Sequence, residues 1–311
     1  MISNLKNIWK NFTVSKVLKG KDIILLFHHV GNSVGFQSKF HSVSTHEFQS
    51  MLIGMKKDWD FVDENEMLTS SSLKGKRPKA LLTFDDGYKS TINATSDFLV
   101  EQKIPFIHFI NTSSMQGEVL WRDKIRAIID AGKSEQFVSF SGLKTLQPSQ
   151  LYHQTKNPNL VNSKIMAKLV NQYCKEEEIE ILNEGVEFAT SIDLKKQLSN
   201  PFLKIGNHSA NHFVLSSLTK EEQQIEIQNA HQQLISLFGV EKVSQVFSAP
   251  FGGSESVNQS TIEILKDCGY KALMLTESNA ILKEGKGIKV KFSDFPTYRR
   301  FLPKQGFKYY N

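Results

Sequence analysis

Two short clusters of residues in this 311-residue chain carry the side chains that a hydrolytic metal site needs. Asp85-Asp86-Gly87 follows an apolar run, and two adjacent carboxylates are costly to ionise together unless a cation relieves their repulsion. In His208-Ser209-Ala210-Asn211-His212 the imidazoles are four residues apart, so both fall on one face of a helical turn. One carboxylate and two histidines leave coordination positions open for water, as hydrolysis by a metal requires.

Each cluster has an ordinary explanation when it is taken alone. Asp-Asp-Gly after a strand is often a turn or a helix N-cap, and a His pair is often a surface accident. A third turn, Pro250-Phe251-Gly252-Gly253, also follows an apolar run in this chain. Three polar turns of this kind after strand-like runs favour a common site over three coincidences.

The elements that must position these residues alternate between strands and helices. Strands are predicted at 23–27, 80–84, 104–110, 202–206, 246–250 and 271–275, and helices at 46–57, 93–101, 220–238 and 256–268. This alternation indicates parallel βα units. In βα barrels the active site lies at the carboxyl ends of the strands, and the first predicted strand ends in His28-His29.

Two segments depart from this alternation. Residues 121–196 are mostly helical, and we interpret them as a helical insertion into a barrel that spans 21–311. Residues 1–20 have apolar side chains at helical spacing and predict a short amphipathic helix, which either packs on the domain or rests on a membrane surface.

The composition excludes several classes of protein. With 40% hydrophobic and 23% charged residues, the chain is too apolar for a disordered protein, and a net charge of +6 is mild for a nucleic-acid binder. Two cysteines, Cys174 and Cys268, cannot form a disulfide scaffold or a four-cysteine zinc site. No apolar run approaches a membrane span and no export signal is visible, so we expect a cytoplasmic protein, with contact at the inner face of the membrane as a further hypothesis.

The clusters together resemble the motifs of a known family. Thr83-Phe84-Asp85-Asp86-Gly87-Tyr88 resembles the first motif of the NodB-homology polysaccharide deacetylases (carbohydrate esterase family 4), and the His208–His212 segment resembles their second, His-[Ser/Thr]-x-x-His. Ser248-Ala249-Pro250-Phe251-Gly252 is similar to the third motif, Arg-x-Pro-Tyr/Phe-Gly. The opening Leu25-Leu26-Phe27-His28-His29-Val30-Gly31 resembles a Tyr-His-x-Val segment of a bacterial branch that acts on surface polysaccharides.

The resemblance implies an α/β fold, a distorted (β/α)7 barrel of the NodB-homology type, with the largely helical insertion at 121–196. It implies one divalent metal held by Asp86, His208 and His212, and Asp85 as the general base. Zinc is the expected metal, with cobalt, nickel or manganese as alternatives. The backbone N–H of Phe251, next to Pro250, matches the donor to the oxyanion. A further residue, Tyr88, either lines the pocket mouth or packs the turn.

The chain departs from the family pattern at two positions. Ser248 stands where the third motif usually opens with an arginine that pairs with the base, and Arg122 is our candidate replacement, against an ordinary ion-paired arginine. The usual histidine acid near the last strand is missing, since no histidine follows His231. We therefore expect His28 to be the acid or a partner of the site, against a purely structural histidine. His29 is expected to be structural or to face solvent.

These features predict a metal-dependent hydrolase that removes N-acetyl groups from an amino sugar in a bacterial glycan or glycan precursor. A cytoplasmic location favours a lipid-linked or nucleotide-linked precursor. The alternatives are a deformylase or an acetyl esterase of the same fold, or a catalytically inactive barrel that binds glycans.

Overall fold

The computed structural model describes residues 18–31, 42–69, 77–179, 187–277, 281 and 287–303. The amphipathic helix predicted at 1–20 therefore lies outside the described residues, apart from its last three positions. Within these ranges no helix has both the length and the apolar character that crossing a membrane requires.

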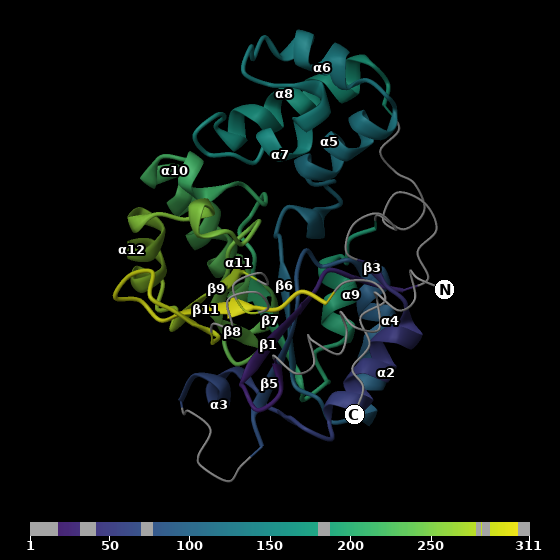
Figure 1. Ribbon diagram of the computed structural model, residues 1–311, viewed down its shortest axis with the longest axis vertical. Helices are drawn as coiled ribbons and strands as arrows, with labels where there is room; N and C mark the ends of the chain where they lie inside the picture. Colours follow the sequence, from purple (N-terminus) through teal and green to yellow (C-terminus); the bar gives the residue numbers. More distant parts are fainter. Residues whose placement is uncertain are drawn as a thin grey trace.

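Seven parallel strands in the described part of the chain curl into the barrel that the sequence predicts (Figure 1). Around the barrel they are β1 (Ile23–Phe27), β5 (Lys79–Phe84), β6 (Phe106–Ile110), β7 (Leu203–Asn207), β8 (Val243–Ser248), β9 (Ala272–Thr276) and β11 (Thr297–Arg300). Phe301, just after β11, accepts a hydrogen bond from Leu26 N (2.8 Å) and donates one to Ile24 O (2.7 Å). These bonds join the last strand to the first.

Four short strands accompany the barrel. They are β2 (His29–Val30), β3 (Ser42–Val43), β4 (Asp60–Phe61) and β10 (Lys289–Val290). The strands β2 and β3 pair with each other, β4 adds to β5, and β10 runs antiparallel to β11. No strand was predicted from the sequence at the position of β11.

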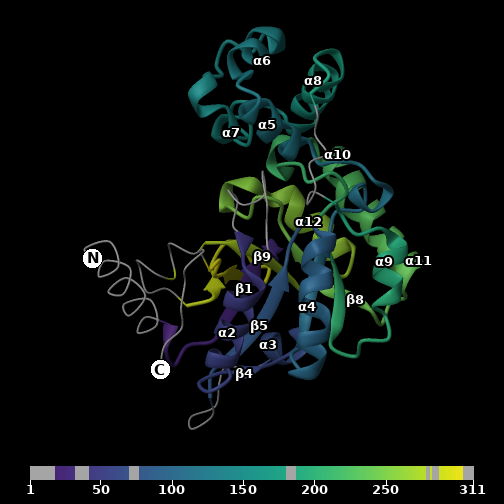
Figure 2. The same ribbon diagram turned by 90° about the vertical axis from the view of Figure 1, so that its right-hand side faces the viewer.

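Helices cover the outside of the barrel (Figures 1 and 2). They are α2 (Thr45–Met55), α3 (Glu64–Thr69), α4 (Lys89–Glu101), α9 (Ser191–Lys196), α10 (Lys220–Gln224), α11 (Ala230–Phe238) and α12 (Gln259–Asp267), with single turns at η2 (Ser114–Gln116), η3 (Pro148–Gln150), η4 (Leu215–Ser217) and η6 (Ser254–Ser256). The helix predicted at 220–238 is interrupted by one π-helical segment, η5 (Ile225–Asn229), between α10 and α11. Such segments are frequent at functional sites.

The strands are buried on both faces, which explains why they appear in the sequence as continuous apolar runs. Ile24, Leu81 and Ile107 belong to one cluster that fills the barrel. Their neighbours Leu25 and Leu82 belong to another, which packs against α2 and α4. This arrangement leaves the carboxyl ends of the strands free to present polar residues.

A group of helices lies beyond one end of the barrel (Figures 1 and 2). It consists of α5 (Trp121–Asp130), α6 (Ser134–Ser141), α7 (Leu151–Gln154) and α8 (Ser163–Glu176). Its apolar side chains share one buried cluster with residues of β8, β9 and α12. The buried face of α5 also carries charged residues, Arg122, Asp123 and Arg126. The interpretation of 121–196 as an insertion stays a prediction.

Candidate metal centre and active site

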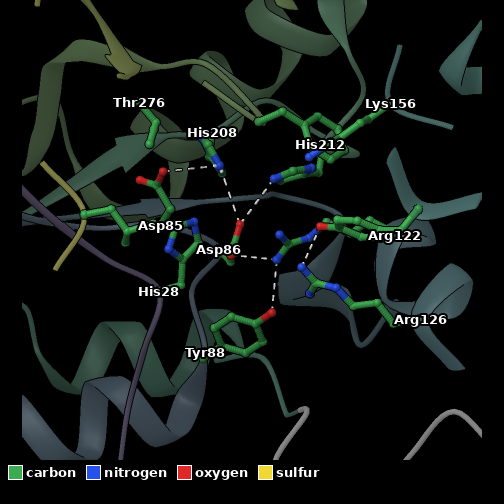
Figure 3. A pocket seen from close by; sticks show the side chains of 13 residues that line it. His28, Asp85, Asp86, Tyr88, Arg122, Arg126, Lys156, His208, His212 and Thr276 are labelled. Atoms are coloured by element: carbon green, nitrogen blue, oxygen red, sulfur yellow. Dashed lines mark hydrogen bonds and ion pairs between the residues drawn. The ribbon is translucent and has the colours of Figure 1, made fainter. Parts of the chain in front are cut away.

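Residues that follow β1, β5, β7 and β8 meet at one pocket of about 110 Å³ (Figure 3). The strands are parallel, so their carboxyl ends lie at the same end of the barrel. The lining residues are His28, Asp85, Asp86, Tyr88, Arg122, Arg126, Tyr152, Lys156, His208, His212, Phe251, Thr276 and Leu302. The structure thus brings together the acidic and histidine clusters that the sequence singled out.

Asp86, His208 and His212 form a buried cluster whose ligand atoms all lie within 4.8 Å of one another. Asp86 Oδ1 is 3.3 Å from His212 Nε2 and 3.5 Å from His208 Nε2, and it accepts no hydrogen bond from the described residues. A buried carboxylate oxygen without a donor is costly. A divalent cation between the three atoms would remove that cost, and the mixed nitrogen and oxygen set suits such a metal.

Neighbouring groups fix both imidazoles. His208 Nδ1 lies 2.8 Å from the carbonyl oxygen of Ser248, so this nitrogen carries the proton and Nε2 is left for the metal. The indole of Trp121 donates a 3.0 Å hydrogen bond to the carbonyl of His212. Burial lowers the pKa of His212 to about 3, which keeps its imidazole neutral and able to bind a metal.

The backbone is strained at this site. Among the described residues, six other than glycine have a positive φ, and four of them are Asp86 (73°), Ser209 (66°), His212 (57°) and Phe251 (61°). Left-handed backbone is unfavourable for such residues and concentrates at functional sites. In the same turn as Phe251, Gly252 has a φ of 69°, and a Cβ there would collide with Thr276.

The π-helical segment holds the loop that carries the two histidines. The buried carboxylate of Glu226 accepts hydrogen bonds from Asn211 N (2.8 Å) and Asn211 Nδ2 (2.6 Å), and its carbonyl accepts one from Ala210 N (3.0 Å). Asn211 thus steadies the loop. Glu226 was not predicted, since nothing in a helical pattern reveals a π-helical turn.

Asp85 is paired with an arginine that the sequence analysis missed. Arg300 Nη1 and Nη2 each lie 2.7 Å from one oxygen of the Asp85 carboxylate, and Nη2 also donates to the hydroxyl of Ser248 (2.8 Å). Arg300 is completely buried. Burial raises the pKa of Asp85, but the charge and the hydrogen bonds of Arg300 outweigh burial and hold this pKa below its usual value.

The prediction that Arg122 replaces the missing motif arginine is wrong about its partner. Arg122 does enter the pocket, but its Nη2 lies 2.6 Å from Asp86 Oδ2 and 3.0 Å from the hydroxyl of Tyr88. Burial raises the pKa of Asp86, but Arg122 and the two histidines outweigh burial and hold it well below its usual value. Arg122 occupies one carboxylate oxygen and leaves the other facing the imidazoles.

The remaining predicted residues are also near the pocket. Figure 3 shows the ring of His28 beside Asp85 and Asp86. His29 is buried rather than solvent-facing, and its ring packs edge-on against that of Tyr88. Tyr88 lines the pocket and also stacks on Phe188, so both interpretations of this residue apply.

Phe251 lines the pocket, where its ring packs against His212 and Trp121. Pro250 is buried beside Phe251 and is not among the described residues that line the pocket. The roles assigned to these residues from the sequence remain proposals.

Comparison with known proteins agrees with this fold. The profile of the family described as "Polysaccharide deacetylase" matches residues 72–273. No curated protein sequence matches the chain significantly.

Three solved structures show the same fold over most of their length. The Streptococcus pyogenes deacetylase PplD in complex with acetate is 15% identical, with a TM-score of 0.56 over 90% of this chain and 91% of that one. IcaB from Ammonifex degensii is 16% identical, with a TM-score of 0.54 over 92% and 93%. A de-N-acetylase from Aggregatibacter actinomycetemcomitans is 14% identical, with a TM-score of 0.54 over 91% and 94%.

Proposed function

Because this chain belongs to the polysaccharide deacetylase family, we propose that it is a metal-dependent hydrolase that removes N-acetyl groups from an amino sugar in a glycan or a glycan precursor. One observation carries the proposal. A metal-compatible cluster of Asp86, His208 and His212 shares a pocket with a second carboxylate, Asp85, which Arg300 holds ionised.

Asp86, His208 and His212 are the residues that would hold the metal, with zinc expected and cobalt, nickel or manganese as alternatives. A bound divalent metal supplies a Lewis acid that polarises the acyl carbonyl and makes a water more acidic. The strained backbone at Asp86 and His212 and the bond from Trp121 hold these ligands in place before the metal binds.

Asp85 is the proposed general base. It lies beside the cluster, with one oxygen 3.7 Å from His208 Nε2, and its carboxylate can accept a proton from the attacking water. Arg300 and Ser248 fix the orientation of this carboxylate. Because Arg300 keeps Asp85 ionised, the base is ready at neutral pH.

Two other groups complete the reaction. The backbone N–H of Phe251 is the proposed donor to the oxyanion that forms when water adds to the carbonyl. His28, on the side of Asp86 away from Arg122 in Figure 3, is the proposed acid that protonates the leaving amine. Without that proton, the amine would be a very poor leaving group.

The test is release of acetate from acetylated amino sugars by the zinc-loaded protein. We expect Asp85→Asn to abolish release while it keeps the metal, because the amide cannot accept the proton. Equal acetate release by the wild type and this variant would contradict the mechanism. Parallel assays of formate from N-formyl sugars and of acetate from O-acetyl sugars identify the acyl group, and thus separate a deacetylase from a deformylase or an esterase.

The substrate proposed here is an acetylated glycan or its lipid-linked precursor, and the proposed location is the cytoplasm at the inner face of the membrane. The contact with the membrane is supported by the apolar periodicity of residues 1–20 in the sequence, which is typical of an amphipathic helix. We expect the full chain to co-sediment with vesicles that contain anionic lipids, and a chain lacking residues 1–17 to stay in the supernatant. Equal sedimentation of both chains would contradict this membrane contact.

A further inference from the structure

One wall of the pocket is basic, and it comes from the helical segment rather than from the barrel. Arg122 and Arg126 belong to α5, and Tyr152 and Lys156 belong to α7 and the turn that follows it. Figure 3 shows Arg122, Arg126 and Lys156 on the side of the pocket away from His28. The deacetylation chemistry proposed above uses none of Arg126, Tyr152 and Lys156.

The acidic groups of the pocket are already paired. Asp85 has both oxygens on Arg300, and Asp86 has one oxygen on Arg122. Asp123, beneath the wall, accepts a 2.7 Å hydrogen bond from Arg126. Asp86 turns its other oxygen toward the two imidazoles, so none of these carboxylates pairs with Lys156.

Lys156 is the cation that remains. Its ammonium nitrogen lies 5.1 Å from the centroid of the Tyr152 ring, and no carboxylate of the described residues lies within 4.0 Å of it. The guanidinium carbon of Arg126 lies 4.9 Å from the same centroid, and Arg126 Nη2 lies 2.6 Å from the Tyr152 hydroxyl. One aromatic ring thus holds two cations at the edge of the pocket.

Lys156 therefore lacks an acidic partner among the described residues, whereas Asp123 already pairs with the buried Arg126, which is 6% exposed. The attraction of Lys156 to the Tyr152 ring stabilises its charge only in part. An anion bound between the wall and the metal cluster would pair with Lys156, and the metal charge would strengthen its binding.

We propose that Lys156, Arg126 and Tyr152 form a recognition wall for a negatively charged oxygen group, a phosphate or a carboxylate, on the sugar that carries the acetamido group. This inference rests on the proposed function, since it names the class of substrate for the same pocket. Lys156 binds the anion directly, whereas the Tyr152 ring positions Lys156 and Arg126 holds the Tyr152 hydroxyl. A phosphate here would be the group that links a sugar precursor to its carrier, and a carboxylate would belong to an acidic sugar.

Binding of sugars that lack an acetyl group tests the wall without any turnover. The probes are glucose 1-phosphate, glucuronic acid and methyl glucoside, titrated calorimetrically into the zinc-loaded protein. We expect at least one charged probe to bind about tenfold more tightly than methyl glucoside, and Lys156→Gln to remove most of that preference. Lys156→Arg keeps the positive charge, so it should keep the preference for charged probes. Whichever charged probe binds more tightly, glucose 1-phosphate or glucuronic acid, shows whether the wall prefers a phosphate or a carboxylate.

The matched control is Lys168→Gln, which removes the same charge from an exposed position on α8 outside the pocket. It should bind all three probes as the wild type does. Equal binding of charged and neutral probes would overturn the proposal. So would a preference that survives in Lys156→Gln, since the metal alone would then be binding the anion.

A turnover assay separates this proposal from the proposed function. Acetate release is compared between N-acetylglucosamine 1-phosphate, N-acetylmuramic acid and methyl N-acetylglucosaminide. A lower KM for a charged substrate that rises in Lys156→Gln supports both proposals. Equal hydrolysis of charged and neutral substrates would contradict the proposed recognition wall but would support the proposed deacetylase. Charge-selective binding without hydrolysis of any probe would overturn the deacetylase and leave the wall standing.

Discussion

Arg300, at the end of β11, donates one hydrogen bond of 2.7 Å to each oxygen of the Asp85 carboxylate at the end of β5. The two residues are 215 positions apart in the chain. Ser248, the position where the family's third motif has its arginine, donates to the same carboxylate from its hydroxyl at 3.2 Å. The proposed base thus has an arginine partner, but this partner comes from a different strand.

Arg300→Met should raise the pKa of Asp85 and lower the activity at neutral pH. Arg300 lowers the pKa of Asp85, so its removal raises that pKa. The base acts only when ionised, so the acid limb of the profile of kcat/KM against pH should move to higher pH, with a loss of activity of about a hundredfold or more. An unchanged acid limb would show that Arg300 does not set the state of Asp85.

Two further variants distinguish this role from a general loss of structure. Arg299→Met removes the neighbouring arginine, which pairs with Glu277 rather than with the site, and should leave the pH profile unchanged. Ser248→Arg in the Arg300→Met background returns an arginine to the motif position and should move the acid limb back. Thermal unfolding of each variant shows whether it is folded, since breaking a buried ion pair costs about 3–5 kcal/mol.

The sequence predicted much of the fold because the parallel strands are buried on both faces, and continuous apolar runs are easy to recognise. It did not predict β11, where Thr297-Tyr298-Arg299-Arg300 contains two arginines in four residues and looks like a polar loop. In the barrel, Tyr298 and Arg300 alternate with Thr297 and Arg299, and the inward face accepts Arg300 because Asp85 neutralises it. A sequence does not display a partner that lies across the barrel.

The sequence predicted the acidic and histidine residues of the candidate site, but not the partners of its arginines or its basic wall. Asp85 and His208 follow strands directly, and Asp86 and His212 lie in the loops that begin there, so all four meet where the ends of the parallel strands converge. Arg122 was placed in the pocket correctly but given the wrong partner, because a helix pattern does not fix which of two adjacent carboxylates an arginine reaches. The basic wall went unnoticed, since Arg126 and Lys156 belong to different turns of a helical segment whose path the sequence does not define.

Metal content is the direct test of the cluster. We expect wild-type protein purified without chelator to carry about one equivalent of divalent metal, and Asp86→Ala, His208→Ala and His212→Ala to carry little. Removing one of three buried ligands leaves too few donors to hold the ion. His153→Ala removes an exposed histidine outside the pocket and should keep the metal. Elemental analysis measures all five proteins, and full occupancy in Asp86→Ala would contradict the assignment.

His28→Gln should impair amides far more than activated esters. If His28 protonates the leaving amine, its loss slows deacetylation by about a hundredfold to ten-thousandfold. The nitrophenolate of 4-nitrophenyl acetate leaves without a proton, so hydrolysis of this ester should change little. Steady-state rates on both substrates measure the contrast. An equal loss on both would mean that His28 supports the site without acting as its acid.

His108, on β6, is a buried histidine outside the catalytic pocket. Its ring stacks on Phe84 at a centroid distance of 4.6 Å and packs edge-on against Phe106, and neither ring nitrogen has a hydrogen-bond partner among the described residues. Burial lowers its pKa from 6.5 to about 3. Between about pH 3 and pH 6.5, His108 therefore stays neutral in the folded protein but is protonated in the unfolded chain.

His108→Phe should stabilise the protein, and by more at acidic pH. Phenylalanine fills a similar volume without unpaired nitrogens, so the free energy of unfolding should rise by about 1–3 kcal/mol at pH 7.5. Below pH 6.5 the wild type loses stability as the unfolded chain takes up its proton, so the advantage of the variant should grow by as much as about 1.4 kcal/mol per pH unit.

Urea unfolding at pH 7.5 and 5.5, in the presence of a chelator, measures both effects of His108→Phe. His212 has a similarly lowered pKa, but it is present in both proteins and its contribution cancels in the difference. His153→Phe, at an exposed position, controls for the added ring and should show no such pH dependence. A difference between wild type and His108→Phe that stays constant from pH 7.5 to 5.5 would mean that His108 takes up its proton in the folded state as well, and that its ring is not shut off from water.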